Sequence, residues 1–355
     1  MRVLHVVGAR PNLVKMAPVI GELRECFPDW PTKIVHTGQH YDRLMSEIFL
    51  EELGVPEPDH LLGVGSDGHA EQVARVMQRL APVLEAERPD LVVIPGDVNS
   101  TLGAALCAAK LGIATAHVES GLRSFDRAMP EETNRIVADH LSALCFLHCE
   151  EAIENLRAEG VGEERMKFVG NTMIDTLVAL EGRFRERDAA AALGVEAGGY
   201  LLVTLHRPAL VDGPLLGETM EQLSKVGAEL QVVFPVHPRT RKMLGGATYR
   251  GITLTDPVGY LDFLSLEADA AAVLTDSGGI QEETTYLGVP CFTLRDNTER
   301  PVTVHSGTNT LLGLDPARIA EIPSLLGGVG RASADPPELW DGRAAERVAD
   351  VLGGW

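Results

Sequence analysis

The stretch Val273-Leu274-Thr275-Asp276-Ser277-Gly278-Gly279-Ile280-Gln281-Glu282-Glu283-Thr284 is the most informative part of this sequence. An apolar strand ends here, and two glycines lead into a predicted helix. Ser277 can cap that helix, Gly278 and Gly279 let the backbone approach a ligand closely, and the unpaired N–H groups favour an anion. Glu283 follows about one and a half turns later, where its carboxylate can accept hydrogen bonds from ribose hydroxyls. The stretch indicates a nucleotide-diphosphate site, with a bare strand-to-helix turn as the alternative.

Composition limits the kinds of partner. The chain has 355 residues, of which 45% are hydrophobic and 5% aromatic, enough for two ordinary α/β domains with aliphatic cores. Its formal net charge of -20 argues against nucleic acid or an anionic membrane as the main partner, because long-range repulsion opposes both. We find no leader peptide and no apolar run of about 20 residues, so we expect a cytoplasmic protein.

Cysteine usage indicates a reducing compartment. The five cysteines are odd in number and lie mostly in apolar surroundings, which predicts buried free thiols: Cys26, Cys107, Cys145, Cys149 and Cys291. Cys145 and Cys149 flank His148 in a way that suggests metal ligands, but no second cluster completes a set of four. We therefore predict neither a structural metal nor disulfides.

Short apolar runs alternate with helix-like stretches along the chain, the pattern of parallel strands covered by helices. The runs are Val3–Val7, Lys33–Thr37, Leu91–Pro95, Ala114–Val118 and Leu144–His148, then Tyr200–Leu205, Gln231–Val236, Ile252–Thr253, Ala271–Thr275 and Val289–Thr293. This pattern predicts two Rossmann-like sheets in tandem. The predicted domains are 1–172 and 173–340, followed by a C-terminal helix and tail (341–355) whose expected packing partner is the N-terminal domain.

Polar residues follow almost every run, at the carboxyl ends of the predicted strands. They include Gly8-Ala9-Arg10, Gly38-Gln39-His40, Gly96-Asp97, Glu119, His206-Arg207, His237 and the turn at Ser277. Ligands of open α/β sheets bind at this edge, so these residues predict an interdomain cleft with cations, carboxylates and a phosphate cradle.

Four cations suit a diphosphate: Arg10, Lys15, His206 and Arg207. A solvated helix residue is the alternative for Lys15. A hydrogen-bonded core histidine is the alternative for His237, which lies in Pro235-Val236-His237-Pro238.

Carboxylates form the other half of the predicted site. Asp97 and Glu119 end neighbouring strands, and Pro130-Glu131-Glu132 opens a helix with proline in its first turn. The positive end of the helix dipole favours the ionised, base-competent form of Glu131. A metal site is the alternative, but Mg²⁺ usually shares its shell with phosphates and no Asp-x-Asp spacing is present. We therefore assign these carboxylates to acid and base catalysis, without a cofactor.

A series of motifs now carries a resemblance. These are Gly8-Ala9-Arg10-Pro11 through Lys15-Met16-Ala17-Pro18, Thr37-Gly38-Gln39-His40, Gly96-Asp97, His117-Val118-Glu119-Ser120-Gly121-Leu122-Arg123, Pro130-Glu131-Glu132-Thr133-Asn134-Arg135, His206-Arg207, Pro235-Val236-His237-Pro238, Asp276 to Glu283 and Thr298-Glu299-Arg300-Pro301. In this order, up to about Gly313, the chain resembles the non-hydrolysing UDP-N-acetylglucosamine 2-epimerases. The resemblance implies a GT-B fold of two Rossmann-like parallel-sheet domains facing a central cleft, and a homodimer.

The resemblance also implies a reaction and its residues. UDP leaves C1 as a carboxylate removes the C2 proton, giving 2-acetamidoglucal, and UDP re-adds after protonation of the other face. The implied catalytic residues are Asp97, Glu119, Glu131 and His206. The implied residues for UDP and sugar are Arg10, Lys15, Arg123, His237, Phe263 near uracil, Ser277, Gly278, Gly279, Glu283 and Arg300.

The chain departs from many relatives at Ala9 and Asn12, around Asp97, and at Pro208-Ala209-Leu210 after the His-Arg pair. The last positions, with Asp42, correspond to a second site that activates some relatives, so the departures argue against allosteric activation here. Four alternatives remain open: a UDP-2,3-diacetamido uronic acid as substrate, hydrolysis to free N-acetylmannosamine and UDP, a GT-B glycosyltransferase, and a nucleotide-sugar-binding regulator without turnover.

Overall fold

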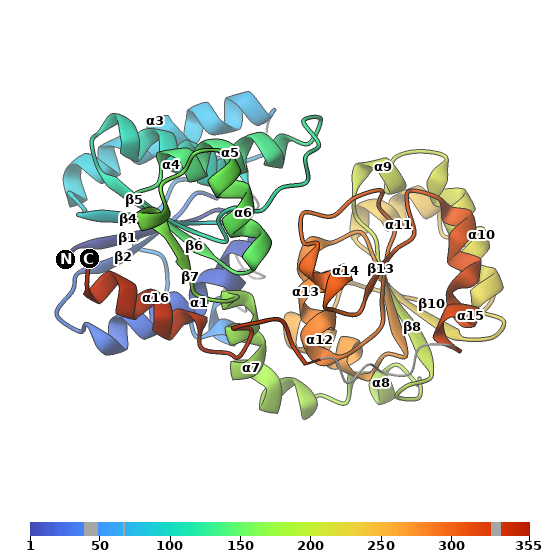
Figure 1. Cartoon of the computed structure of the whole chain (residues 1–355). Coiled ribbons are helices and arrows are strands. Elements are labelled where there is room, and N and C mark those ends of the chain that lie inside the picture. Colours follow the sequence, from blue (N-terminus) through green and yellow to red (C-terminus); the bar gives the residue numbers. More distant parts are fainter. Residues whose placement is uncertain (39–48, 67, 328–334) are drawn as a thin grey trace. The chain divides into compact units, whose positions relative to one another are not determined.

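The computed structural model describes residues 1–38, 49–66, 68–327 and 335–355. They form two compact units, each on its own parallel sheet (Figure 1): Met1–Ala179 with Glu338–Trp355, and Leu180–Pro337. The expected turn residues Gln39, His40 and Asp42 lie outside the described residues. No helix in the described part of the chain combines the length and hydrophobicity that crossing a bilayer requires.

The first unit contains a seven-stranded parallel sheet with the order β3-β2-β1-β4-β5-β6-β7. The strands are β1 (Val3–Val7), β2 (Thr32–His36), β3 (His60–Leu61), β4 (Leu91–Pro95), β5 (Ala114–Val118), β6 (Leu144–Leu147) and β7 (Met166–Phe168). All five residues of β1 and of β4 are buried, because helices cover both faces of the sheet.

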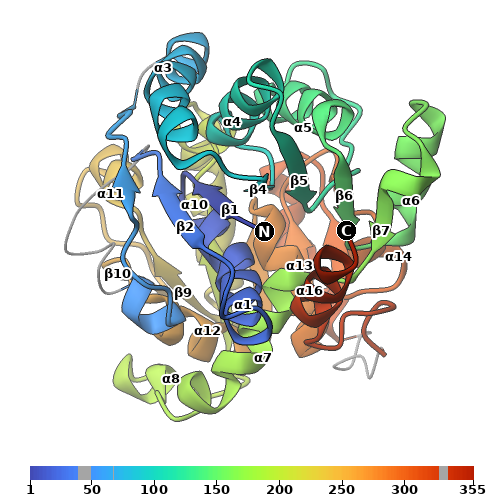
Figure 2. The same ribbon diagram turned by 90° about the vertical axis from the view of Figure 1, so that its left-hand side faces the viewer.

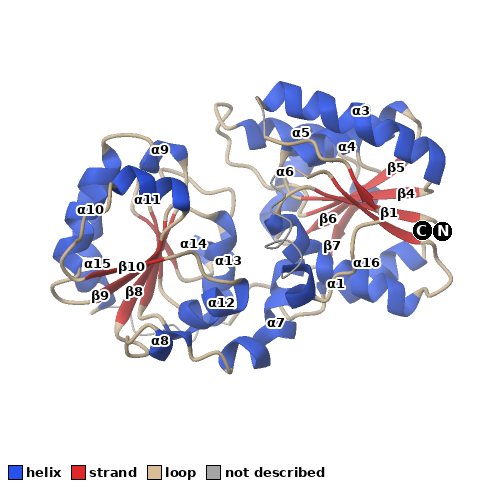
Figure 3. Cartoon of the chain, turned by 180° about the vertical axis from the view of Figure 1, so that it is seen from behind, coloured by secondary structure: helices blue, strands red, loops and turns tan. Residues whose placement is uncertain are grey.

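The helices of this unit are α1 (Arg10–Cys26), α3 (His69–Glu87), α4 (Asn99–Lys110), α5 (Pro130–Leu141), α6 (Glu150–Ala158), η1 (Glu163–Arg165), α7 (Thr172–Arg185, from Leu180 in the second unit) and α16 (Ala344–Gly353). On one face of the sheet, α3, α4 and α5 pack side by side, and α1 and α16 lie on the other (Figure 3). Leu80, Leu84 and Ala104 of these helices share a buried cluster with Val6 and Val92 of the strands.

The C-terminal helix α16 packs against α1, close to the N-terminus of the chain (Figures 1 and 2). Its first N–H groups, those of Ala344 and Ala345, donate to the carboxylate of Asp175 in α7 over 3.0 and 2.6 Å. The indole of Trp340, which is fully buried, donates to the carbonyl oxygen of His148. These bonds attach the end of the chain to the first sheet.

The second unit contains a six-stranded parallel sheet with the order β10-β9-β8-β11-β12-β13. The strands are β8 (Tyr200–Thr204), β9 (Gln231–Pro235), β10 (Ile252–Thr255), β11 (Ala272–Thr275), β12 (Cys291–Thr293) and β13 (Asn309–Leu311). Its helices are α8 (Ala189–Ala192), α9 (Pro208–Val211), α10 (Leu215–Val226), α11 (Pro238–Leu244), α12 (Tyr260–Asp269), α13 (Gly278–Leu287), α14 (Val302–His305), η2 (Pro316–Glu321) and α15 (Ile322–Leu326).

Two separate clusters cover the two faces of this sheet. Leu216, Met220 and Leu223 of α10 pack with Val232 of β9 on one face. On the other face, Leu266 of α12 packs with Tyr200, Val233 and Val273, whose side chains point the opposite way from the first cluster. Alternate strand residues thus serve opposite faces, as the pleat of a strand requires.

The predicted α/β class and the ten predicted strands are confirmed, with ends that differ by at most two residues. The run at Val289 begins two residues too early, because the N–H of Val289 bonds to Thr284 at the end of α13 and the strand starts after Pro290. Three short strands at the sheet edges escaped prediction: β3, β7 and β13. They span two or three residues, too few to show a pattern.

Candidate active site

The first group of site residues lies at the carboxyl ends of β1, β4 and β5. The Nζ of Lys15 lies 2.5 Å from Oε2 of Glu119, and both side chains are about 95% buried. A Cβ placed on Gly96, next to Asp97, would lie 3.2 Å from the Lys15 Nζ and 4.0 Å from Oε1 of Glu119. Lys15 is therefore not a solvated helix residue, and the turns after β4 and β5 meet at this ion pair.

Asp97 is held by an arginine from α5. Both Nε and Nη2 of Arg135 donate to Oδ2 of Asp97, over 2.9 and 2.7 Å. The Nη1 of the same arginine donates to Glu132, which also accepts from Ser124 and from the backbone N–H of Phe125. Since Arg135 is 2% exposed and bound on both sides, this ion pair holds the Asp97 carboxylate in a fixed orientation.

Glu131 occupies the first turn of α5, next to Pro130 at the start of the helix. It is half-buried, and its carboxylate makes no hydrogen bond or ion pair with any residue in the described ranges. The helix dipole stabilises its negative charge. Of the three predicted catalytic carboxylates, it is the one that neither an arginine nor a lysine of the described residues holds in place.

Glu119 adopts a left-handed backbone conformation, with φ of 67°. Such a conformation costs a residue with a side chain about 1–3 kcal/mol and persists only where neighbouring bonds enforce it. The N–H of Ser120 donates to the Phe146 carbonyl, and the N–H of Gly121 donates to Asp139. In this backbone conformation the Glu119 side chain points toward Lys15, with which it forms the ion pair.

Arg10 and Arg123 differ sharply in exposure. Arg10 is exposed at the start of α1, with its Cζ 5.9 Å from the centre of the Phe49 ring. Arg123 is 3% exposed, and its guanidinium donates to Glu159, to Asp139 and to the Leu122 carbonyl. The surroundings of Arg10 therefore suit a ligand contact, and those of Arg123 suit a role beneath the surface.

In the second unit, His206 and Arg207 follow β8 beside Asp276, which follows the neighbouring β11. The Nδ1 of His206 lies 2.9 Å from Oδ1 of Asp276, and the N–H groups of His206 and Arg207 also donate to this carboxylate. Burial acts to raise the pKa of Asp276, but the hydrogen bond from His206 and those from the backbone lower it below its ordinary value. The half-exposed imidazole is thereby oriented with Nε2 pointing away from Asp276.

Ser277 is the N-cap residue of α13, as predicted, but its hydroxyl makes no capping hydrogen bond. The first N–H groups of α13 thus lack an intrahelical partner and point out of the helix end, as an anion site requires. A Cβ on Gly278 would collide with the guanidinium of Arg300. Arg300 itself is 4% exposed and pairs with Glu282 and Glu299.

Glu283 lies on α13, 2% exposed, and accepts a 2.7 Å hydrogen bond from the Tyr260 hydroxyl of α12. Burial raises the pKa of Glu283 to about 7, although the hydrogen bond from Tyr260 acts in the opposite direction. Phe263, one turn along α12, is half-buried against the core. His237 is exposed after β9, so the alternative of a core histidine is wrong.

Sequence reasoning missed the residues that hold these side chains: Asn12, Arg135, Asp139, Tyr260 and Asp276. Asn12 accepts from the N–H groups of Gly8 and Ala9 and so shapes the turn after β1. The one available signal was periodicity, because Glu132, Arg135 and Asp139 are spaced by three and four residues and share one face of α5.

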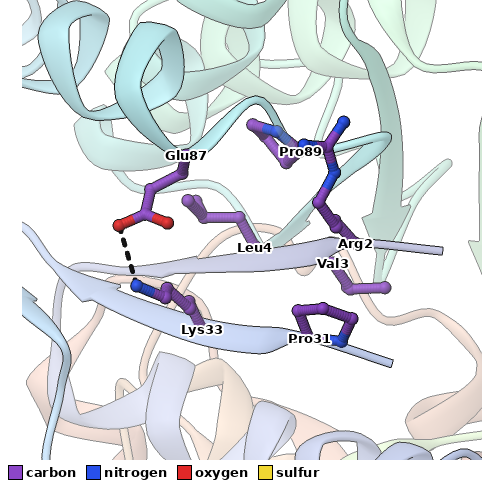
Figure 4. A pocket seen from close by; sticks show the side chains of 7 residues that line it. All are labelled: Arg2, Val3, Leu4, Pro31, Lys33, Glu87 and Pro89. Carbon is purple, nitrogen blue, oxygen red and sulfur yellow. Dashed lines mark hydrogen bonds and ion pairs between the residues drawn. The ribbon is translucent and has the colours of Figure 1, made fainter. Parts of the chain in front are cut away.

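A small pocket opens elsewhere, at the amino ends of β1 and β2 (Figure 4). It is lined by Arg2, Val3, Leu4, Pro31, Lys33, Glu87 and Pro89. Lys33 and Glu87 form an ion pair of 2.9 Å there. The pocket lies at the amino ends of the strands and the carboxylates lie at the carboxyl ends, so it forms no part of the candidate site.

All five cysteines are free thiols, with Cys26 exposed and the other four buried.

Two Rossmann-like parallel sheets with polar strand ends define an α/β protein of the GT-B class. Residues 25–353 match the family model described as UDP-N-acetylglucosamine 2-epimerase, and the chain belongs to this family. It is 40% identical to the UDP-N-acetylglucosamine 2-epimerase of Methanocaldococcus jannaschii, with 99% of each chain covered. It is 38% identical to the UDP-2,3-diacetamido-2,3-dideoxy-D-glucuronate 2-epimerase of Pseudomonas aeruginosa, also over 99% of each.

A solved structure agrees with this assignment. The crystal structure of the M. jannaschii UDP-GlcNAc 2-epimerase in complex with UDP-GlcNAc and UDP superposes with a TM-score of 0.90, at 38% identity and with 100% of both chains covered. The expected fold and family are therefore confirmed.

Proposed function

We propose that this protein interconverts UDP-N-acetylglucosamine and UDP-N-acetylmannosamine without hydrolysis, through elimination and re-addition of UDP. Family membership supports a 2-epimerase, and the M. jannaschii relative was crystallised with UDP-GlcNAc and UDP. The three carboxylates near the ends of β4 and β5 and at the start of α5 supply the proton transfers.

The observation that carries this proposal is the unequal environment of the carboxylates. Asp97 is paired with Arg135 and Glu119 with Lys15, whereas Glu131 has no partner within the described residues. Epimerisation requires proton removal on one face of C2 and proton delivery on the other. Two anchored carboxylates and one unpaired carboxylate provide an acid and a base that need not be the same group.

UDP binding is assigned to the second unit. His206, oriented by Asp276, and the N–H groups of Gly278 and Gly279 at the start of α13 suit the diphosphate, together with Arg10 of the first unit. Glu283 suits the ribose hydroxyls and Phe263 the uracil ring. Stabilising the charge on departing UDP is the largest expected contribution to catalysis.

The proposed reaction consists of two proton transfers at C2 and the breaking and re-forming of the C1–O bond. A carboxylate takes the C2 proton while the C1–O bond breaks, and the electron pair of the C–H bond becomes the C1–C2 double bond of 2-acetamidoglucal. UDP leaves with the electrons of the C1–O bond. A protonated carboxyl then delivers a proton to the opposite face of C2, and UDP re-adds at C1.

Turnover in deuterated water tests this mechanism. UDP-N-acetylglucosamine should yield UDP-N-acetylmannosamine, and proton NMR should show deuterium at C2 of both epimers. Recovery of unlabelled substrate and no second epimer would contradict the proposal. Free N-acetylmannosamine and UDP would instead identify a hydrolysing enzyme.

One alternative substrate has a specific observation behind it. The P. aeruginosa relative, described as acting on a UDP-2,3-diacetamido uronic acid, is 38% identical over 99% of both chains. Parallel assays with the two UDP-sugars separate the candidates by their kcat/KM ratio. Transfer of the sugar to an added acceptor would indicate a glycosyltransferase, and tight UDP binding without any turnover would indicate a regulator.

We further propose a division of labour, in which domain 1–172 carries the acid and base groups, domain 173–340 binds UDP, and the tail 341–355 belongs structurally with the first. A homodimer in the cytoplasm completes the proposal. Sedimentation equilibrium checks the dimer, which would have twice the 38.2 kDa mass of the chain.

A further inference from the structure

Beneath the carboxylates lies a buried polar pair that the proposed reaction does not use. The Nδ1 of His117, on β5, is 2.6 Å from Oδ1 of Asp139, on α5, and both side chains are fully buried. Charged and polar groups are rarely buried without a partner, because removing them from water costs free energy. A buried pair of this kind therefore calls for an explanation.

Asp139 connects to the turn that carries Glu119. Its Oδ1 accepts from the hydroxyl of Ser120, and its Oδ2 accepts from the N–H of Gly121 over 3.1 Å and from Arg123 over 2.7 Å. Ser120 and Gly121 directly follow Glu119, whose backbone is in the left-handed conformation. One carboxylate therefore holds the two residues that keep Glu119 in its strained orientation.

On its other side, His117 contacts the turn that carries Asp97. Its Nε2 lies 2.7 Å from the carbonyl oxygen of Gly96, which directly precedes Asp97. Both ring nitrogens face an acceptor, Asp139 on one side and the Gly96 carbonyl on the other. The imidazole thus bridges the Asp139 carboxylate and the Gly96 carbonyl.

The charges around Asp139 favour its ionised form. Burial acts to raise the pKa of Asp139, but the charges of His117 and Arg123 outweigh it and lower the pKa to about 2. Two further groups approach the backbone of Asp139: the Cys145 thiol of β6 and Nη2 of Arg165 donate to its carbonyl oxygen. Burial raises the pKa of Cys145 to about 11, so it remains a neutral thiol.

We propose that His117 and Asp139 are positioning residues, which through the Gly96 carbonyl and the Ser120–Gly121 turn set the orientation of Asp97 and Glu119 for proton transfer at C2. Neither touches the substrate. This inference rests on the proposed epimerase function. It explains why α5, which carries Glu131 and the Asp97 partner Arg135, also carries the carboxylate that holds the Glu119 turn.

Asp139→Asn and His117→Ala test the proposal in the full chain. We expect kcat to fall about 10- to 100-fold, because displacements of an ångström at reacting groups have effects of this size. KM and the Kd for UDP should change by less than about threefold, since neither side chain bonds to a residue proposed to contact the diphosphate, the ribose or the uracil. His117→Gln keeps a donor toward Gly96 and should recover part of the lost kcat.

The control variant is Asp175→Asn. Asp175 is also a buried carboxylate that accepts two backbone N–H bonds, but it serves α16. All variants are compared at a temperature where circular dichroism shows them folded. Loss of kcat in Asp175→Asn equal to that in Asp139→Asn, or kcat of Asp139→Asn within about twofold of wild type, would overturn the proposal.

The pH dependence of kcat distinguishes a positioning role from a mere loss of stability, because lower stability does not shift the acidic limb. In His117→Gln, Asp139 loses the interaction with His117 that helps to lower its pKa, so the acidic limb of kcat should move to higher pH. An unmoved limb together with unchanged kcat would overturn the proposed role.

Failure of the epimerase function is recognised separately, because wild-type protein would then show no deuterium at C2. In that case crystal structures of wild type and Asp139→Asn decide the question. Movement of the Gly96–Asp97 and Glu119–Gly121 turns in the variant supports positioning, and superimposable turns refute it.

Discussion

At the level of single residues, the site combines groups that the fold has already paired with groups that remain available. Lys15 and Arg135 neutralise Glu119 and Asp97 from close range. Glu131 has no such partner in the described ranges, and its removal should therefore disturb chemistry more than folding.

Glu131→Gln is expected to lower kcat by about 100-fold or more while Tm stays within experimental error, because acid–base groups contribute about 10²–10⁴-fold. Glu71→Gln is the matched control, since Glu71 also lies in the first turn of a helix and is exposed. Turnover and melting curves of both variants check the prediction. Equal activity of the two variants would remove Glu131 from the mechanism.

Glu283→Gln should stabilise the free protein and weaken UDP binding. The pKa of Glu283 in the folded protein is raised to about 7, so the folded state holds this proton more tightly than the unfolded state does. Wild-type stability is therefore lost as pH rises from about 4.5 to about 7, by up to roughly 3 kcal/mol, and stays lower above pH 7. The glutamine variant avoids this loss.

Urea unfolding at pH 5 and pH 8 measures the difference. The gain in unfolding free energy for Glu283→Gln should be near zero at pH 5 and largest at pH 8, while calorimetry at pH 8 shows weaker UDP binding. A variant less stable than wild type at pH 8 would show that the Tyr260 hydrogen bond outweighs the cost of burial.

At the level of elements, two helix starts determine distinct properties. At the start of α13 the Ser277 hydroxyl makes no capping hydrogen bond, whereas at the start of α16 two N–H groups donate to Asp175. N–H groups without a capping acceptor can bind a ligand, and N–H groups that are bonded to Asp175 attach the end of the chain.

Gly278→Ala should raise the Kd for UDP at least about tenfold, because an added Cβ displaces the Arg300 guanidinium and occupies the approach to the helix end. Gly217→Ala is the matched control, since a Cβ there meets nothing within 4 Å and Gly217 also lies near the start of a helix. Calorimetric titration with UDP compares the two. Unchanged affinity in Gly278→Ala would move the phosphate site away from α13.

Asp175→Ala should destabilise the protein by about 1–2 kcal/mol, because two N–H groups of α16 lose their acceptor. Hydrogen exchange should accelerate in α16 before it does in β1 or β4. Uniform acceleration across the first sheet would indicate instead that α16 and the sheet unfold as one cooperative unit.

At the level of the whole molecule, the dominant property is a formal charge of -20. Self-repulsion of this size destabilises the compact state and is screened by salt. Tm should therefore rise by a few degrees between about 10 and 300 mM sodium chloride. Differential scanning calorimetry checks this, with sucrose as the uncharged comparison; a falling Tm would show that attractive ion pairs dominate.

The sequence by itself determined the two parallel sheets and the end of each sheet at which the residues of the candidate site lie. Runs such as Val3–Val7 and Leu91–Pro95 are fully apolar because strands covered on both faces must be, so they were visible without a structure. The residues after them, Asp97 and Glu119 among them, had to meet at one edge because parallel strands share their carboxyl ends.

Only the tertiary structure decided which partner each of these side chains has. Arg135 reaches Asp97 across 38 positions, His117 reaches Asp139 across 22, and Asp175 caps α16 across about 170. Periodicity reports which face of an element is buried, but it carries no information on which distant polar group lies opposite. That depends on how α5 and α7 pack, and hence on the whole of the first unit.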